Sequence, residues 1–256
     1  MYLEKLLVTL LTAPVIAPVP TTVAHQVVAQ APAQPTPAPA APKAEAPKAE
    51  APKAVEKKVA PEVKELVERM QAFYEKTQDF SADFKQDYKY KALRRTQTST
   101  GTVIYKKPGL MRWEYLKPST RTFVLAGEKV YAYDPEAQTL SVGRIDTSQL
   151  SASVTFLFGQ GKLADEFSIS KGACKDCKGT LLVLDPLKPD PRFQQVRLEV
   201  DPKTAQVLKS TVVDPDGSEN AIAFLNLKTN VGVGADAFKI NPPEGTRIDD
   251  FTKPRK

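Results

Sequence analysis

The sequence predicts an α+β domain that is mainly β, in which one helix precedes a long antiparallel sheet. Apolar residues recur at helical spacing over Pro61–Gln78. From Phe80 onward hydrophobicity alternates with a period of two, and Asp-Pro and Pro-Gly turns separate short segments rich in β-branched and aromatic residues. Such a chain is expected to form a barrel or a sandwich, and 256 residues are enough for one such domain behind a leader.

The predicted helix carries one apolar stripe. Pro61 and Glu62 suit its first turn and Lys76 suits its last. The stripe consists of Val63, Leu66, Val67, Met70, Phe73 and Tyr74. Residues at these spacings lie on one face of a helix, so this face is expected to cover a sheet.

Eleven strands are expected. In the first, Phe80–Tyr90, charged residues alternate with mostly apolar ones, which indicates one solvated face. The others are expected at about 96–106, 110–116, 121–125, 129–134, 138–144, 167–171, 180–186, 193–201, 206–214 and 220–229. The gap from Asp146 to Phe167 lacks this alternation and has Leu150, Val154, Leu157 and Phe158 at helical spacing. One or two short helices are therefore predicted there, giving a strongly curved sheet two helical covers.

The first 60 residues are predicted to serve export and tethering. Residues 1–29 contain a short cationic start, an apolar stretch and small-residue cleavage sites, as in a signal peptide. Residues 30–60 include the repeated segment APKAE, whose composition cannot bury apolar area. This Ala/Pro/Lys-rich stretch is interpreted as a disordered linker, either a spacer or a solubilising tail. Residues 61–256 are then expected to form the folded, exported domain.

Composition argues against an enzyme. The only histidine, His25, lies in the leader, which disfavours histidine-dependent catalysis and histidine-bearing metal sites in the domain. No nucleophile elbow, phosphate-binding loop or dinucleotide fingerprint is present. We therefore expect no catalytic residues, no metal and no cofactor.

Cys174 and Cys177 form a CxxC motif at a predicted hairpin tip between two glycines. In an exported protein this spacing favours a disulfide that clamps the turn. A redox pair and a metal site are the alternatives, but a catalytic redox pair normally opens a helix, and here strands flank the motif.

Positive charge is concentrated in residues 85–131, which hold eleven Lys and Arg against three acidic residues. Such a zone can attract an acidic partner or anionic lipid headgroups. The alternative is an ordinary solvated face of the strands. Export and the lack of a binding motif argue against nucleic acid.

Aromatic and flexible apolar residues gather on single strand faces. Met111, Trp113 and Tyr115 share one side of a strand. On two other strands the residues that share a side are Phe80, Phe84, Tyr88 and Tyr90, and Tyr131 and Tyr133. If the sheet closes tightly, these residues are core. If it stays open, Phe84, Met111, Trp113, Tyr115 and Tyr133 line an apolar cavity.

Four segments resemble the outer-membrane lipoprotein carrier (LolA) family. They are FSADFKQ from Phe80, GTVIYKKPGLMRWEYLKP over Gly101–Pro118, LAGEKVYAYDPEAQTL from Leu125 and FKINPPEGTRIDD from Phe238. The resemblance covers about residues 62–252 in the right order. It implies an incomplete, unclosed antiparallel barrel of about 11 strands with a helical lid over an apolar cavity.

The resemblance also implies site residues. Met111 and Trp113 would line the cavity, and Phe156, Leu157 and Phe158 would belong to the lid helices. Lys107 stands where the family often has an arginine that holds the lid shut. Lysine is a point donor without the planar fork of arginine, so lid closure is expected to be weaker or made differently.

Function follows from the same resemblance. It implies a periplasmic chaperone that binds lipoprotein acyl chains and transfers them from the inner to the outer membrane. Its partners would be acylated lipoproteins, an inner-membrane lipoprotein-releasing ABC transporter and an outer-membrane acceptor, with the carrier itself a monomer. The alternatives are a membrane-tethered sensor or scaffold that binds lipid or lipoprotein with the same fold, and an exported enzyme.

Overall fold

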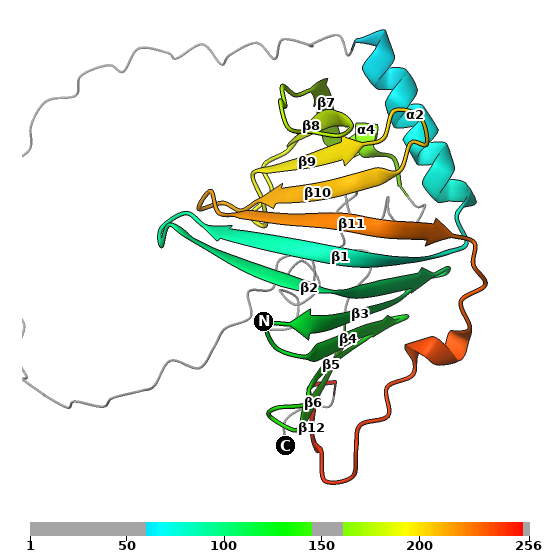
Figure 1. Ribbon diagram of the computed structural model, residues 1–256, viewed down its shortest axis with the longest axis vertical. Helices are drawn as coiled ribbons and strands as arrows, with labels where there is room; N and C mark the ends of the chain where they lie inside the picture. The colour runs from blue at the N-terminus through cyan, green and yellow to red at the C-terminus, as the bar shows by residue number, and fades with distance from the viewer. Residues whose placement is uncertain (1–59, 145–160, 253–256) are drawn as a thin grey trace, which may run out of the picture. The chain divides into compact units, whose positions relative to one another are not determined.

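Twelve strands form a single sheet in the computed structural model, which describes residues 60–144 and 161–252. The sheet order is β12-β6-β5-β4-β3-β2-β1-β11-β10-β9-β8-β7 (Figure 1). The elements are α2 (Pro61–Lys76), β1 (Asp79–Tyr90), β2 (Arg95–Lys106), β3 (Leu110–Lys117), β4 (Arg121–Ala126), β5 (Lys129–Asp134), β6 (Thr139–Arg144), α4 (Leu163–Glu166), β7 (Phe167–Lys171), β8 (Thr180–Pro186), β9 (Gln195–Val200), β10 (Val207–Val213), β11 (Glu219–Thr229), the short 3₁₀ helix η3 (Ala235–Phe238) and β12 (Arg247–Asp250).

The predicted fold class is confirmed. All eleven predicted strands are present, and within the described ranges the edge strands β7 and β12 do not pair to close the sheet. The prediction missed β12, whose four residues RIDD pair in parallel with β6. A short polar edge strand has no alternation of its own, so only its partner reveals it.

Helix α2 ends two residues earlier than predicted. The Thr77 side chain donates a hydrogen bond to the Phe73 carbonyl at 2.8 Å, and the Thr77 backbone is already extended. No helix among the described residues is long and apolar enough to span a membrane.

One face of the sheet, here called the inner face, carries two hydrophobic clusters. Strand pairing aligns five of its residues across β8, β9, β10, β11 and β1, namely Leu182, Leu198, Ser210, Ile222 and Gln86. At the β7–β10 end α2 covers this face with Val63, Leu66, Met70 and Tyr74, which pack on Leu182, Leu184, Val196, Leu198 and Val200. At the β1–β5 end lies a second cluster, and Phe224 of β11 packs against both.

The outer face of β3 and β4 is covered by the chain that follows β11. Phe238 of η3 is buried there, and the Arg112 guanidinium donates to the carbonyl oxygens of Ala237 and Lys239. Figure 1 shows this segment beside the sheet before the chain returns to form β12. The second cluster lies on the opposite, inner face of these strands.

The predicted insertion lies mostly outside the described residues. Of the gap between Asp146 and Phe167, the structure describes α4, whose Leu163 is buried in the cluster under α2. Residues 145–160, which include Phe156, Leu157 and Phe158, and the leader and linker over residues 1–59 are outside the described ranges.

Candidate functional site

Five aromatic rings meet on the inner face of β1, β3, β4 and β11. Phe84 contacts Trp113 and Tyr115 edge-on, with ring centroids 4.8 and 5.0 Å apart. Tyr115 contacts Phe123 at 5.7 Å, and Trp113 contacts Phe224 at 6.4 Å. We call these five rings, with Met111, the aromatic floor.

The alternation of the strands places these side chains together. Trp113 pairs with Phe123 of β4, and Tyr115 lies two residues further along β3, so both point to the same face. Phe84 reaches the same face from β1, across Gly101 of β2. A Cβ atom at position 101 would lie 2.8 Å from two Phe84 ring carbons, so glycine leaves room for that ring.

The aromatic floor is graded in exposure. Phe84, Trp113 and Tyr115 are 2–3% exposed, whereas Met111, Phe123 and Phe224 are only partly buried. The indole N–H of Trp113 donates to the Met111 sulfur at 2.8 Å, which leaves this end of the floor without an unpaired polar group. Apolar binding, rather than bond making, is the chemistry available to such a surface.

Polar residues occupy the adjoining part of the inner face. The Gln86 amide donates to the Asn220 side-chain oxygen at 2.9 Å, and both residues are buried. Burial raises the pKa of Tyr115, and the adjacent Gln86 side chain partly offsets this rise. A deeply buried polar group therefore borders the apolar surface.

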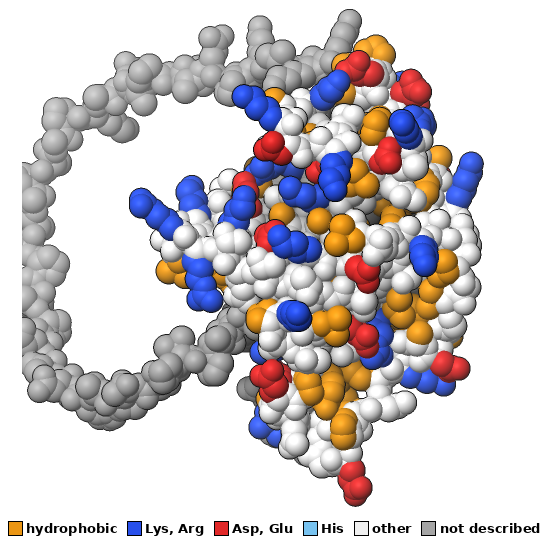
Figure 2. Space-filling view, viewed as in Figure 1, with side chains coloured by type: hydrophobic (Ala, Val, Ile, Leu, Met, Phe, Trp, Pro, Cys, Tyr) orange, Lys and Arg blue, Asp and Glu red, His pale blue; other side chains and the backbone are white. Residues whose placement is uncertain are grey.

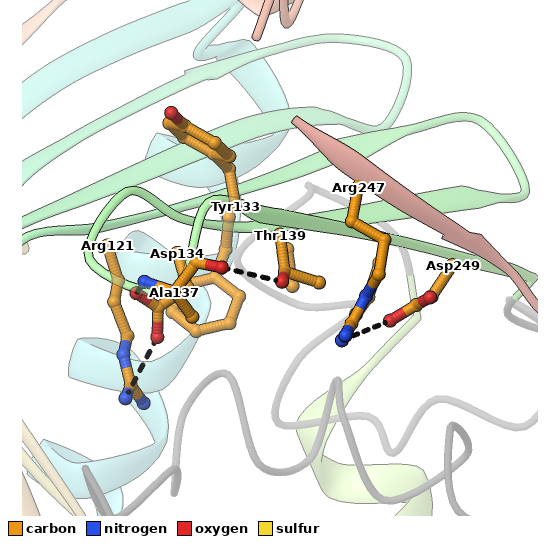
Figure 3. A pocket seen from close by; sticks show the side chains of 10 residues that line it. Arg121, Tyr133, Asp134, Ala137, Thr139, Arg247 and Asp249 are labelled. Atoms are coloured by element: carbon orange, nitrogen blue, oxygen red, sulfur yellow. Dashed lines mark hydrogen bonds and ion pairs between the residues drawn. The ribbon is translucent and has the colours of Figure 1, made fainter. Parts of the chain in front are cut away.

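A pocket of about 340 Å³ adjoins the aromatic floor at Phe123 (Figure 3). Arg121 forms an ion pair with Asp134 at 3.2 Å, and Arg247 forms one with Asp249 at 3.0 Å. Both pairs line the pocket. Because a hydrocarbon chain there would cover charged groups without replacing their hydration, this pocket does not suit an acyl chain.

The structure brings together four of the five predicted lining residues that it describes. Phe84, Met111, Trp113 and Tyr115 lie on the inner face in one cluster. Tyr133 instead pairs with Thr122 of β4 and Leu140 of β6. The β5 residue aligned with Trp113 through Phe123 is Ala132. Tyr133 is one residue further along β5 and therefore points to the outer face. Figure 3 shows its ring directed away from Asp134. Tyr133 is thus excluded from the floor.

Sequence reasoning missed Phe123 and Phe224. Phe123 lies in a short strand next to Val124 and Leu125, so no alternation shows which residues face inward. Phe224 pairs with Phe84 across 140 residues of sequence, and only strand pairing reveals that contact. The described residues also contain no group of three or more His, Cys, Asp or Glu placed to hold a metal ion.

The sequence matches the family model of the outer membrane lipoprotein carrier protein LolA over residues 75–241. The matched region contains all of β1–β11 and the aromatic floor. The chain belongs to the LolA family. This confirms the resemblance found in the Gly101–Pro118 block, and LolA-family proteins are non-enzymatic binding and transport proteins.

Two curated relatives are named outer-membrane lipoprotein carrier proteins. The one from Dechloromonas aromatica is 28% identical over 183 residues, covering 71% of this chain and 86% of the relative. The one from Chromohalobacter salexigens is 29% identical over 181 residues, covering 71% and 85%. These relatives support a lipoprotein carrier role.

Among solved structures, an uncharacterized conserved protein from Thermus thermophilus aligns with a TM-score of 0.48 at 13% identity. The alignment covers 73% of this chain and 98% of that one. The family assignment depends on the sequence matches.

Lys107, the residue predicted to contact the lid, contacts α2. Its ammonium group donates to the carbonyl oxygens of Tyr74 and Glu75 at 3.2 and 2.7 Å. These carbonyls belong to the last turn of the helix, where a cation is favourable. The contact joins the β2–β3 turn to α2. A role of Lys107 in holding the inserted lid stays a prediction.

Replacing Lys107 by methionine is expected to lower the free energy of unfolding by about 1–2 kcal/mol, because two hydrogen bonds from a charged donor are lost. Denaturant titration of the variant would measure this change. Lys107→Arg, which keeps the charge and the donors, should stay near wild type. Equal stability of Lys107→Met and wild type would show that the contact contributes nothing to folding.

Cys174 and Cys177 are bonded to each other at the β7–β8 turn. The Glu199 carboxylate accepts hydrogen bonds from the backbone N–H groups of Lys178 and Gly179 at 2.6 and 3.2 Å. The disulfide and the hydrogen bonds to Glu199 therefore both hold this turn. It lies at one edge of the sheet, separated from β1 by β9, β10 and β11.

Removing both sulfurs with Cys174→Ser and Cys177→Ser is expected to cost no more than about 2 kcal/mol, because the closed loop is very short. Binding to the aromatic floor should be unchanged. Thermal unfolding and lipid binding of the double variant would be compared with wild type. A loss of lipid binding by a stable double variant would assign the motif a functional role.

The basic zone is divided between structural and exposed residues. Lys106 donates to the Val233 carbonyl at 2.7 Å, and Lys107 and Arg112 bind carbonyl oxygens as described above. Exposed cations gather instead at the end of the β1–β2 hairpin, where Figure 2 shows a cluster of Lys and Arg side chains. They are Lys89, Lys91, Arg94 and Arg95. Lys85, Lys117 and Lys129 of the zone are exposed as well, so cations that could attract an anionic surface are densest at this end without being confined to it.

Proposed function

We propose that this protein binds the acyl chains of lipoproteins on its aromatic floor and carries them through the periplasm from the inner to the outer membrane. The observation that supports this most is the aromatic floor itself, on the inner face of an unclosed sheet in a LolA-family chain. An apolar surface of this kind suits hydrocarbon. It offers no group for covalent chemistry.

The energetics agree with such a role. Burying each acyl methylene stabilises a complex by about 0.8 kcal/mol, so a chain of about 15 methylenes gains roughly 12 kcal/mol. This is enough to hold a chain out of water, and it roughly balances the same gain that the chain has in a membrane. A carrier must also release it, and an unclosed sheet allows the floor to be covered and uncovered without breaking a ring of strands.

Loading would begin at the partly exposed side chains. Met111, Phe123 and Phe224 border the more deeply buried Phe84, Trp113 and Tyr115. Flexible and aromatic side chains can change rotamer as methylenes enter between them. In this proposal the insertion around residues 146–163, with Phe156, Leu157 and Phe158, forms the lid that separates the bound chain from water.

The proposal includes export and delivery. Residues 1–29 would act as the signal peptide and residues 30–60 as a tether that extends the reach of the domain. The carrier would be a monomer. It would receive cargo from an inner-membrane lipoprotein-releasing ABC transporter and pass it to an outer-membrane acceptor.

Release of lipoproteins from spheroplasts tests the proposal. The chain without residues 1–29 would be added to spheroplasts of the source organism, and the soluble fraction would be analysed for acylated lipoprotein bound to it. We expect soluble complexes with one carrier each. If a folded protein released none, the carrier role would be wrong, and retention of the chain on membranes would then favour a tethered sensor or scaffold.

A further inference from the structure

The end of the β1–β2 hairpin carries the most exposed large hydrophobic side chain that the structure describes. Leu93, in the turn between the two strands, is 68% exposed. The pairing with β3 reaches only Thr100 of β2, and the pairing with β11 reaches only Lys89 of β1. The hairpin therefore projects beyond both neighbouring strands (Figure 1). We call residues 90–95 the hairpin tip.

Cations flank this leucine. Lys91, Arg94 and Arg95 are exposed, and within the described residues none of the three forms an ion pair. Lys91 is attracted by Asp216 without an ion pair between them. The two arginines therefore carry positive charge that no neighbouring carboxylate of the described chain balances.

The backbone of Arg94 has an unusual conformation for an arginine. Its φ is 47°, in the left-handed region. Glycine and asparagine adopt this region at lower cost than residues with long side chains. The shape of the turn therefore does not account for an arginine here, and the exposed guanidinium group indicates a role outside the fold.

Tyrosines lead from the hairpin tip toward the aromatic floor. Tyr88 and Tyr90 lie an even number of residues from Phe84 on β1, so they are on the same side of the strand. Their rings contact each other with centroids 4.5 Å apart, and the Tyr88 hydroxyl donates a hydrogen bond to Asp214. Tyrosine is favoured where lipid meets water, because its ring is apolar and its hydroxyl is polar.

An exposed leucine among arginines suits a surface that is anionic outside and apolar within. A bilayer with anionic lipids is such a surface, since guanidinium groups bind phosphates and a leucine side chain can enter beneath them. A protein partner fits less well. A stable protein interface takes about 800 Å² from each partner, on the order of 20–30 residues. The hairpin tip consists of six.

We propose that the hairpin tip docks the domain on anionic lipid bilayers. Leu93 enters the headgroup region, and Arg94 and Arg95 contact the lipid phosphates. The docking is reversible, because one leucine and two arginines give only weak attachment. It brings the Tyr90 end of the inner face beside the lipid. The inference does not depend on the proposed function, since binding of the tip to lipid requires no cargo.

A tryptophan placed at the tip tests the proposal. The only tryptophan of the chain, Trp113, is 3% exposed and gives a constant background. Full-length Leu93→Trp would be mixed with vesicles of phosphatidylcholine, either pure or containing phosphatidylglycerol. We expect its emission to shift to the blue with the anionic vesicles only, and the shift to decline as ionic strength rises.

The position of the reporter separates docking of the tip from any lipid binding by residues 1–29. Leu187→Trp is the matched control, because Leu187 is also exposed but follows β8, which β9, β10 and β11 separate from β1. Its emission should not shift with either kind of vesicle.

Removing the two guanidinium groups tests the role of charge. Arg94→Gln with Arg95→Gln, made in the Leu93→Trp chain, is expected to raise the lipid concentration at half-maximal shift about 30-fold. Lys188→Gln with Lys203→Gln removes the same charge from exposed sites elsewhere and should change it little. All variants should keep the wild-type melting temperature and bind a fluorescent fatty-acyl probe as wild type does, because none alters the aromatic floor.

Three results would overturn the proposal: no blue shift at position 93, an equal shift with neutral vesicles, or a shift that survives both arginine substitutions. Binding of soluble polyglutamate at the tip without binding of vesicles would also overturn it and would favour an acidic protein partner. None of these results bears on the proposed function, which the fatty-acyl probe tests separately.

Discussion

Met111→Glu is expected to weaken acyl-chain binding by about 100-fold or more. Met111 lies on the inner face between Tyr105 and Leu125 of the neighbouring strands, and it is partly buried beside Trp113. A bound chain would strip water from the new carboxylate. Desolvating an unpaired charge costs several kcal/mol, and about 3 kcal/mol corresponds to roughly 100-fold in affinity.

The domain should still fold, because in the unloaded protein a side chain at this partly exposed position can reach water. Binding would be measured by titration with a fluorescent fatty-acyl probe, and folding by thermal unfolding. Ile104→Glu is the matched control. It places the same charge on the adjacent strand but on the outer face, next to Arg112. Wild-type binding by Met111→Glu would show that acyl chains do not occupy this part of the floor.

Gly101→Ala is expected to be among the most destabilising single substitutions in the domain. A Cβ atom at this position would lie 1.9 Å from the Glu114 carbonyl oxygen and 2.8 Å from the Phe84 ring. The first contact is with backbone, so β3 would have to move away from β2. We expect a loss of about 3 kcal/mol in the free energy of unfolding, which for a domain of this size lowers the melting temperature by roughly 10 °C.

Gly234→Ala is the control for this effect. Gly234 has no heavy atom within 4 Å of the Cβ position and no positive φ, so its substitution should be neutral. Differential scanning calorimetry of both variants would settle the comparison. A Gly101→Ala variant as stable as Gly234→Ala would mean that the close approach of β2 and β3 is not needed for folding.

The sequence by itself determined most elements of this protein. Period-two alternation marks a strand wherever one face is buried and the other is wet, and together with the turn signals it located all eleven predicted strands, although not β12. The stripe from Val63 to Tyr74 likewise predicted the buried face of α2. Alternation also placed Met111, Trp113 and Tyr115 on one side of β3, because that relation is local to a strand.

Only the tertiary structure decided which strand faces meet. Tyr133 looked equivalent to Trp113 in the sequence, but the β3–β4–β5 register aligns Ala132 with Trp113 through Phe123. A shift of one residue reverses every side chain of a strand, and register depends on turns and pairings that sequence alone does not show. For the same reason the structure added Phe123 and Phe224 to the floor.

The surroundings of the Tyr115 side chain were likewise decided only by the tertiary structure. A tyrosine in a strand can be core, surface or binding residue, and nothing in RWEYLK distinguishes them. Its surroundings depend on groups that other strands bring near it, such as Phe84 and Gln86 of β1. Composition and periodicity record burial, whereas hydrogen-bond satisfaction is set by three-dimensional neighbours.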